Sequence, residues 1–172
     1  MRHFIGINIR PEKTSDIQNI DDVTVAAFLN APHTDHTEQF IVKALRDSGA
    51  LTISLIAEDS VQIIGHVALS PVAISCGSDG WYGLGPISVT PKEQGKGVGS
   101  KLMHAAIVEL KKLNANGCVL LGDPNYYHRF GFKPLDSLIP PDVPAEYFQA
   151  LVLQDADPKG TVTYHESFSE QD

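Results

Sequence analysis

The sequence predicts an α/β (α+β) fold in which helices flank a mixed central β-sheet. Three runs rich in β-branched and apolar residues mark strands at residues 51–57, 61–70 and 81–89. Segments with apolar residues at helical spacing lie before and after these runs. A short, wholly apolar run at residues 118–121 is typical of a strand that is buried on both faces. Elements in this order pack as a sheet covered by helices.

The amino-terminal segment is predicted to form a strand and then two helices. Alternating isoleucines at positions 5, 7 and 9 predict a strand that ends at residues 10–11. Ser15 or Asp16 can cap the first helix, and Gly49 ends the second. The apolar positions of the first helix are Ile17, Ile20, Val23, Ala27 and Phe28. Those of the second are Phe40, Ile41, Ala44 and Leu45.

The central segment is predicted to form a hairpin, an interrupted strand and a long helix. Residues 58–60 make the hairpin turn. Gly85-Pro86 interrupts the third strand, and because proline cannot donate to a ladder we expect a bulge there. The long helix is amphipathic and is expected to end near residues 116–117. Late strands are expected at residues 150–153 and 161–164.

Length and charge limit the class of protein. A chain of 172 residues can bury about two-thirds of its unfolded surface in one core, so we expect a single domain over residues 1–172. A net charge of −8 disfavours nucleic acid and anionic membranes as partners. It suits a cationic or amine-bearing small partner, but solubility alone is the preferred explanation of the charge. We find no apolar run near ~20 residues and no hydrophobic signal segment in residues 1–10. Cys76 and Cys118 lack metal-ligand spacing, so we expect free thiols and a cytoplasmic location.

A glycine-rich loop between a strand and a helix is the most informative stretch. Residues 94–100 have the sequence Gln-Gly-Lys-Gly-Val-Gly-Ser. Successive backbone N–H groups would point at one spot, with the positive end of the helix dipole behind them. Three alternating glycines plus Lys96 exceed what a turn needs. We therefore interpret the loop as a cradle for a phosphate or pyrophosphate.

Two common phosphate-binding motifs do not fit this loop. A P-loop needs Ser or Thr directly after Gly-Lys, whereas Gly97 follows Lys96. In the dinucleotide fingerprint the third glycine comes one residue later than Gly99, and several further βα units would have to follow. NAD and ATP are therefore disfavoured as ligands.

The loop resembles the coenzyme A signature of the GNAT N-acetyltransferases, Q/R-x-x-G-x-G/A, in the strand–loop–helix context of that family. Residues 122–132, Gly-Asp-Pro-Asn-Tyr-Tyr-His-Arg-Phe-Gly-Phe, look like the family's Y-x-x-x-G-F element after the fifth strand. Matches to one branch of predicted N-acetyltransferases extend the resemblance over nearly the whole chain, at residues 65–67, 81–86, 144–148 and 164–165. The resemblance implies the GNAT fold, whose central sheet is splayed between strands 4 and 5.

The resemblance also implies acetyl-CoA as co-substrate and no metal. The coenzyme-binding residues that it implies are Ile87, Ser88, Val89, Gln94, Gly95, Lys96, Gly97, Val98, Gly99 and Ser100. Amides of residues 94–100 would bind the pyrophosphate, and the strand at residues 87–89 would pair with the pantetheine arm. The acetyl thioester would lie in the gap to residues 118–121, where backbone donors of the fourth strand would polarise its carbonyl.

Tyr127, four residues before Gly131, occupies the position of the family's usual general acid. It would protonate the departing thiolate while an amine attacks the thioester carbonyl directly. Tyr126 cannot face the same way on a helical turn, so we assign it to packing or to the lining of the acceptor site. Asp123 before Pro124 is predicted to cap a short helix.

The general base stays open. Many family members carry an asparagine where Asp123-Pro124 stands, and the strand at residues 87–89 offers only the hydroxyl of Ser88. An amine of pKa ~10 must lose a proton before it attacks. The base is either a water chain or a residue from another segment. Glu38 is the first candidate, and an ordinary exposed position is the alternative for this residue.

Other residues have structural interpretations. His33 and His36 form His-x-x-His, but nothing else completes a metal ligand set, so a loop role is preferred. Tyr147 and Phe148 could wall the acceptor site, with core packing as the default. Cys118 is expected to be an inert buried thiol.

The predicted function is an acetyl-CoA-dependent N-acetyltransferase acting in a ternary complex on a primary amine, with a small-molecule amine as acceptor. Two other classes stay open: a peptide or protein N-acetyltransferase, and a non-catalytic acyl-CoA-binding sensor. Tyr127 argues against the sensor, because a silent module needs no proton donor. The resemblance also suggests a homodimer.

Overall fold

The computed structural model describes residues 6–31, 34, 36–140, 142–154 and 158–169. Within these residues the main sheet is six-stranded, with the order β1-β2-β3-β5-β6-β8. These strands are β1 (Asn8–Pro11), β2 (Ile53–Glu58), β3 (Ile63–Pro71), β5 (Trp81–Val89), β6 (Gly117–Leu121) and β8 (Phe148–Val152). Only β5 and β6 pair in parallel, so the sheet is mixed, as predicted. A small second sheet joins β4 (Ala73–Ile74), β9 (Gly160–Thr163) and β7 (Leu138–Ile139).

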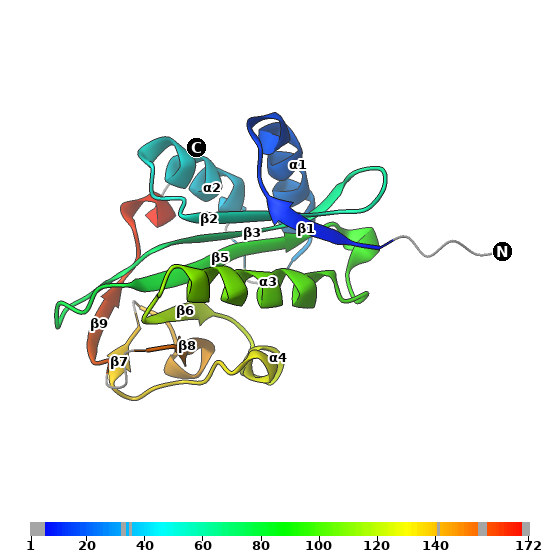
Figure 1. Ribbon diagram of the computed structural model, residues 1–172. Coiled ribbons are helices and arrows are strands. Elements are labelled where there is room, and N and C mark those ends of the chain that lie inside the picture. Colours follow the sequence, from blue (N-terminus) through cyan, green and yellow to red (C-terminus); the bar gives the residue numbers. More distant parts are fainter. Residues whose placement is uncertain (1–5, 32–33, 35, 141, 155–157, 170–172) are drawn as a thin grey trace.

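The helices cover both faces of the main sheet (Figure 1). Helices α1 (Ile17–Phe28) and α2 (Glu38–Ser48) lie on one face, and α3 (Val98–Lys112) lies on the other. A short helix, α4 (Pro124–Tyr127), follows β6. Single 3₁₀ turns are η1 (Thr14–Asp16), η2 (Pro91–Glu93), η3 (His128–Phe130), η4 (Ala145–Tyr147) and η5 (Glu166–Ser169).

The core between α3 and the sheet is built from the predicted apolar face of the helix. Leu102, Ala106 and Leu110, spaced by four residues, are fully buried in one cluster with β2 and β3. On the opposite face, Ile20 of α1 and Val42 of α2 pack on Ile56 of β2. Burial of each large aliphatic side chain contributes about 1.5–3 kcal/mol, so these contacts hold both helical layers on the sheet.

Element boundaries differ from the prediction at three places. β1 begins at Asn8, and Ile5 lies outside the described residues. α3 ends at Lys112 instead of near residue 116, because Asn114 takes a left-handed conformation (φ +56°) that stops the helix. Leu121, the last residue of β6, is 44% exposed, so this strand is not buried along its whole length.

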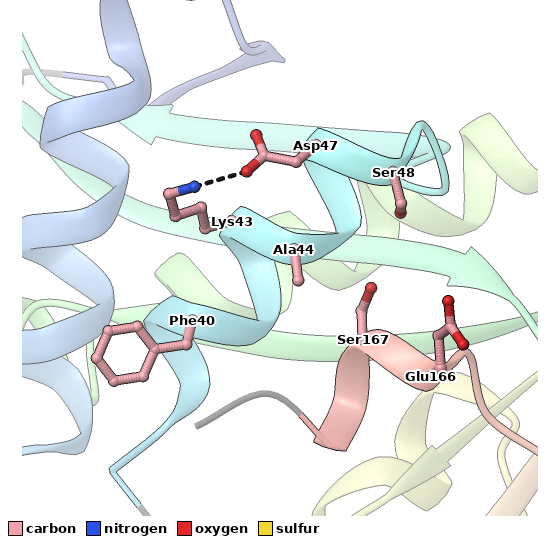
Figure 2. Close-up of a pocket in the computed structure, with 7 residues that line it drawn as sticks. All are labelled: Phe40, Lys43, Ala44, Asp47, Ser48, Glu166 and Ser167. Atoms are coloured by element: carbon pink, nitrogen blue, oxygen red, sulfur yellow. Dashed lines mark hydrogen bonds and ion pairs between the residues drawn. The ribbon is translucent and has the colours of Figure 1, made fainter. Parts of the chain in front are cut away.

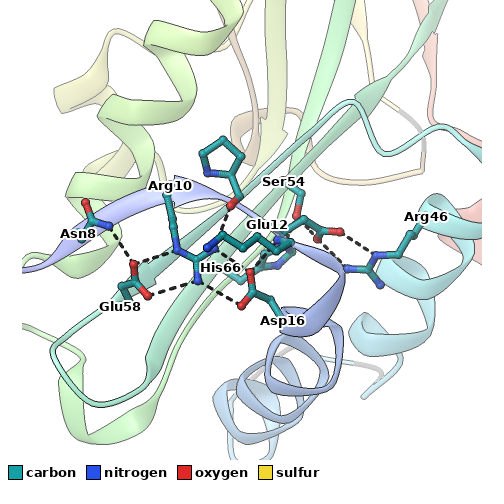
Figure 3. A network of polar contacts seen from close by, with 10 residues as sticks. Asn8, Arg10, Glu12, Asp16, Arg46, Ser54, Glu58 and His66 are labelled. Carbon is teal, nitrogen blue, oxygen red and sulfur yellow. Dashed lines mark hydrogen bonds and ion pairs between the residues drawn. The ribbon is translucent and has the colours of Figure 1, made fainter.

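Asp16 occupies the position before α1, but its carboxylate does not cap that helix. It accepts a hydrogen bond from the backbone N–H of Lys13 (2.7 Å) and pairs with Arg10 (2.8 Å), which lowers its pKa. Arg10 also pairs with Glu58 of β2 (2.9 Å). This carboxylate–guanidinium cluster joins the start of α1 to β1 and β2 (Figure 3).

A second polar network joins α2 to the sheet (Figure 3). Arg46 of α2 pairs with Glu12 (2.8 Å), and Ser54 of β2 donates its hydroxyl proton to the same carboxylate (2.5 Å). The Ser54 oxygen lies 2.7 Å from His66 Nε2, so the histidine donates this hydrogen bond. Burial lowers the pKa of His66 to about 4, which keeps the ring neutral. The network fixes the orientation of α2 relative to the sheet.

Candidate active site

The main sheet opens between β5 and β6. Their parallel pairing ends at Gly83 and Val119. Directly beyond this point, Gly85 and Pro86 of β5 together oppose the single residue Ala68 of β3, which is a β-bulge. The bulge confirms the expectation from the proline. It bends the second half of β5 away from β6 and leaves a gap between two neighbouring strands.

The backbone of β5 beyond the bulge faces this gap at every second residue. Hydrogen-bonding direction alternates along an antiparallel strand, and Thr90 N–H donates to β3 (2.8 Å). By this alternation the backbone groups of Ser88 face β3, whereas those of Ile87 and Val89 face the gap. The side-chain amide of Gln94 donates to the Val89 carbonyl (2.9 Å) and ties the glycine loop to the strand. Ile87 therefore directs a backbone donor and acceptor at a ligand in the gap.

The glycine loop opens into α3 as predicted. Gly95 (φ +79°) and Gly97 (φ +87°) adopt left-handed conformations that other residues take only with strain. Gly97 caps α3, so the amides of residues 98–100 in the first helical turn have no intrahelical acceptor. These donors lie at the positive end of the helix dipole and can bind an anion.

The side chains of the loop differ in their surroundings. Val98 is buried in the core, so only its amide is available to a ligand. Lys96 is exposed and lies 3.7 Å from a carboxylate oxygen of Glu93. The Ser100 hydroxyl is 3.4 Å from the Tyr126 hydroxyl. The structure thus brings the predicted loop residues together around the start of α3, while the side chain of Ser88 is buried in the sheet.

The two tyrosines of α4 point in different directions. Asp123 caps this helix by accepting a hydrogen bond from Asn125 N–H (2.9 Å), as predicted. Tyr127 lines the cavity described below. Tyr126 packs edge-to-face on Tyr127 (4.9 Å between ring centroids) and carries the Arg129 guanidinium 4.5 Å above its own ring. Tyr126 therefore packs on the side of the glycine loop, which agrees with the packing alternative predicted for it, and it is not among the residues that line the cavity.

A cavity of about 560 Å³ lies where β5 and β6 diverge. This volume falls within the range of about 300–1,000 Å³ that is usual for small-molecule sites. Its walls come from β5 (residues 84–87), β6 (Leu120, Leu121), α1 and α2 (Phe28, Glu38, Ile41), α4 (Tyr127) and the tail (Tyr164, Phe168). Burial raises the pKa of Tyr127 to about 12, with smaller contributions from Tyr126 and Asp123, so its hydroxyl stays protonated at neutral pH.

Glu38 is the first residue of α2 and is not an ordinary exposed side chain. The Thr34 hydroxyl donates to its Oε2 (2.5 Å), which fixes the carboxylate. Its Oε1 is buried and has no hydrogen-bond partner among the residues that the structure describes. A buried carboxylate oxygen without a partner is costly, so this position favours a ligand that donates a hydrogen bond.

Tyr164 and Phe168 line the cavity although no motif assigned them to it. Their rings pack edge-to-face (4.9 Å between centroids). A Cβ added at Gly83 would lie 3.2 Å from the ring of Tyr164, so the glycine leaves room for the ring. The Tyr164 hydroxyl is buried without a partner among the described residues, and burial raises its pKa. A glycine in mid-strand was the only signal in the sequence for this close approach.

Several other expectations fall outside the cavity. Phe148 is a core residue, and Tyr147, 47% exposed, lines a separate depression with Val143 and Pro144. His33 lies outside the described residues. Among the residues that are described, no three His, Cys, Asp or Glu side chains group as metal ligands, and no helix is long and apolar enough to cross a membrane. Cys118 is buried, and burial raises the pKa of its thiol.

A larger depression, of about 900 Å³, lies between α2 and η5 (Figure 2). It contains the exposed ion pair of Lys43 and Asp47 (2.6 Å) and the side chain of Glu166. Its lining includes neither the glycine loop nor Tyr127. The smaller cavity at the gap in the sheet, which Tyr127 lines, is therefore the candidate active site.

Comparisons with known proteins agree with this geometry. The chain matches the acetyltransferase (GNAT) domain family over residues 51–134. It is 36% identical over 115 residues to the N-acetyltransferase YhbS of Escherichia coli K12, covering 66% of this chain and 69% of YhbS. The fold and the site define an acyltransferase, and the chain belongs to the GNAT acetyltransferase family.

Two solved structures share its fold over nearly their whole length. A GNAT family acetyltransferase from Brucella melitensis, in complex with acetyl-CoA, is 45% identical with a TM-score of 0.85, covering 95% of this chain and 98% of that chain. YhbS from Escherichia coli, in complex with CoA, is 32% identical with a TM-score of 0.89, covering 99% and 96%. The predicted mixed sheet flanked by helices is therefore confirmed as a GNAT fold.

Proposed function

We propose that the protein is an acetyl-CoA-dependent N-acetyltransferase that acts on the primary amine of a small molecule. One observation carries this proposal: Ile87 and Tyr127 line the cavity where β5 and β6 diverge, and the glycine loop that opens α3 is tied to the end of the same strand β5 by Gln94. The relatives solved with acetyl-CoA and with CoA support the choice of coenzyme.

In this proposal the predicted coenzyme residues have defined tasks, except Ser88, whose side chain is buried and whose backbone pairs with β3. The amides of residues 95–100 bind the pyrophosphate, and Gln94 holds the loop against β5. Ile87 and Val89 pair with the pantetheine amides through the backbone groups that face the gap. Val98 fixes the start of α3 through its buried side chain. Tyr126 and Arg129, beside Ser100, add a hydroxyl and a positive charge on the coenzyme side.

The reaction is direct acyl transfer in a ternary complex, for which bound acetyl-CoA supplies an activated thioester. The backbone N–H of β5 beyond the bulge donates to the thioester carbonyl oxygen and stabilises the negative charge that develops there. Tyr127 donates its phenolic proton to the leaving sulfur. The apolar walls that raise the pKa of Tyr127 also desolvate the leaving thiolate and make it more basic. The pKa values of the donor phenol and of the accepting thiol therefore rise together.

The same geometry bears on the other predicted classes. A silent sensor has no need for a buried phenol at the gap, so Tyr127 still argues against it. A peptide N-acetyltransferase remains the second candidate class and is separated by the acceptor assays below.

We also propose a cytoplasmic location, which the free Cys76 and Cys118 support. A homodimer remains a prediction.

Thermal unfolding with acetyl-CoA, NAD and ATP tests the coenzyme. A ligand that binds only the folded state stabilises it by about 2.7 kcal/mol at a hundredfold excess over its Kd. We expect a clear rise in Tm with acetyl-CoA alone. An unchanged Tm with acetyl-CoA, or a larger rise with NAD, would remove the basis of the assignment. Release of free thiol in the presence of amines then reports transfer.

A further inference from the structure

We propose that the acceptor is a primary amine that carries one positive charge on an apolar or aromatic body, and that Glu38 binds and deprotonates its ammonium group. This inference rests on the proposed function and narrows it to one class of acceptor. It follows from the chemistry of the cavity wall and from the unsatisfied carboxylate oxygen of Glu38.

The described residues that line the cavity include one carboxylate and no Lys, Arg or His. Among these residues Glu38 supplies the carboxylate, and the hydroxyls of Tyr127 and Tyr164 are the only other polar groups of side chains. The remaining surface is apolar, with Phe28 and Phe168 as its aromatic members. Such a wall suits an acceptor whose part other than the amine is apolar. A hydroxyl-rich sugar would lose its hydrogen bonds to water there without replacement.

The wall disfavours acceptors with further charges. The carboxylate of an amino acid would lie in the same cavity as Glu38 and would find no cation among the described lining residues. A second ammonium group, as in a diamine, would find no second carboxylate there. Burial of an unpaired charge is unfavourable, so both kinds of acceptor are selected against.

The carboxylate of Glu38 is positioned to receive one ammonium group. Thr34 occupies Oε2, and Oε1 is buried without a partner among the described residues. An ammonium N–H that donates to Oε1 forms a charge-assisted hydrogen bond, the stronger kind. Transfer of that proton to the carboxylate cancels both charges, which an apolar cavity favours.

The protons balance over the reaction. Glu38 takes one proton from the ammonium group, and the neutral nitrogen attacks the thioester carbon. The C–N bond forms and the C–S bond breaks, while Tyr127 gives its proton to sulfur. As the amide forms, the nitrogen returns its second proton to the Tyr127 phenolate. Glu38 then releases its proton to solvent, so each turnover yields amide, thiol and one proton.

Two matched acceptor pairs test the class. In each pair, 2-phenylethylamine against phenylalanine and butylamine against 1,4-diaminobutane, the second member adds one charged group. With acetyl-CoA saturating, we expect kcat/KM to be at least about tenfold higher for the first member of each pair. A preference for phenylalanine or the diamine overturns the inference, as does acetyl-CoA binding without turnover of either monoamine. A faster reaction with a peptide that begins with phenylalanine overturns it in favour of peptide N-termini.

Glu38→Gln tests the role of the carboxylate, and Glu166→Gln, in the depression between α2 and η5, is the matched control. We expect Glu38→Gln to lower kcat/KM for 2-phenylethylamine by about 10²-fold at neutral pH, with unchanged acetyl-CoA affinity. The loss should shrink as the pH approaches the amine pKa of ~10, because the free amine then needs no base. A purely structural role would give a loss that does not depend on pH, and full activity of Glu38→Gln would exclude the role. Failure of acetyl-CoA to bind the wild type would instead refute the proposed function.

Discussion

Replacing Tyr127 with phenylalanine separates the proton donor from the packing of its ring. The ring contacts Tyr126 edge-to-face and lies so close to Gly122 that a Cβ there would come within 2.8 Å of its Cδ2 atom. Phenylalanine keeps both contacts and removes only the hydroxyl. The variant should therefore fold and bind acetyl-CoA with a Kd within about twofold of the wild type.

The size of the effect follows from what the hydroxyl does. A positioned general acid contributes about 10²–10⁴ to the rate, or about 2.7–5.5 kcal/mol of activation free energy. This stabilisation exists only in the transition state, so kcat and kcat/KM should fall by the same factor. Because the pKa of Tyr127 is raised to about 12, the donor stays protonated and the factor should be constant from neutral pH to about pH 10.

Steady-state thiol release, combined with calorimetric titration of acetyl-CoA, measures both quantities. Tyr126→Phe is the internal control, since the Tyr126 hydroxyl lies 3.4 Å from Ser100 on the coenzyme side. It should change acetyl-CoA affinity slightly and kcat much less than Tyr127→Phe does. Equal turnover of the two variants, or a larger loss in Tyr126→Phe, would refute the assignment of the acid. Full activity of Tyr127→Phe with a true acceptor would mean that water supplies the proton.

Three further predictions concern the loop, the ring position and the buried histidine. Gly99→Ala adds a Cβ at an ordinary 3.4 Å from Tyr126, so calorimetry should show normal folding but about tenfold weaker acetyl-CoA binding. Gly122→Ala should displace the Tyr127 ring and lower kcat by about tenfold or more, with Tm as the folding control. Because the folded-state pKa of His66 is lowered from 6.5 to about 4, stability should be complete above pH 6.5 and fall towards pH 4. In urea unfolding His66 should contribute a slope of up to about 1.4 kcal/mol per pH unit, and His66→Gln should remove this contribution while leaving that of carboxylates with lowered pKa, such as Asp16.

The parts of the fold that follow from local chemistry could be predicted from the sequence. Gly49 ends α2 in a left-handed conformation (φ +80°), and Gly85-Pro86 makes the bulge in β5. The end of α3 was placed too late, because Leu113 continues the apolar pattern beyond the point where Asn114 breaks the helix. Tertiary context decides such boundaries, and a periodic pattern does not contain it.

The candidate site could be predicted only where its residues lie in one stretch of sequence. The glycine loop and Tyr127 belong to continuous motifs: the glycines themselves predicted a phosphate cradle, and the resemblance to the GNAT motifs located Tyr127. Phe28, Tyr164 and Phe168 come from distant parts of the chain, and only the packing of α1 and the tail against the sheet brings them into one cavity. Glu38 was named as a candidate base, but its buried oxygen became visible only with the position of α2.

The gap in the sheet links coenzyme binding to the position of the reacting atoms. Strands inside a sheet normally satisfy their backbone groups on both sides, and unpaired groups at an edge attract a partner. Beyond Gly83, β5 pairs with β3 on one side and has no ladder with β6 on the other. A pantetheine arm carries amides that can form the missing ladder, and it can extend only as far as the fork where Gly83 still pairs with Val119. In the proposed complex the fork would therefore set the depth of the thioester, next to the cavity lined by Tyr127 and Glu38. By this proposal the conformation of Gly85 (φ +147°), which only glycine adopts without strain, would set where the acetyl group is transferred.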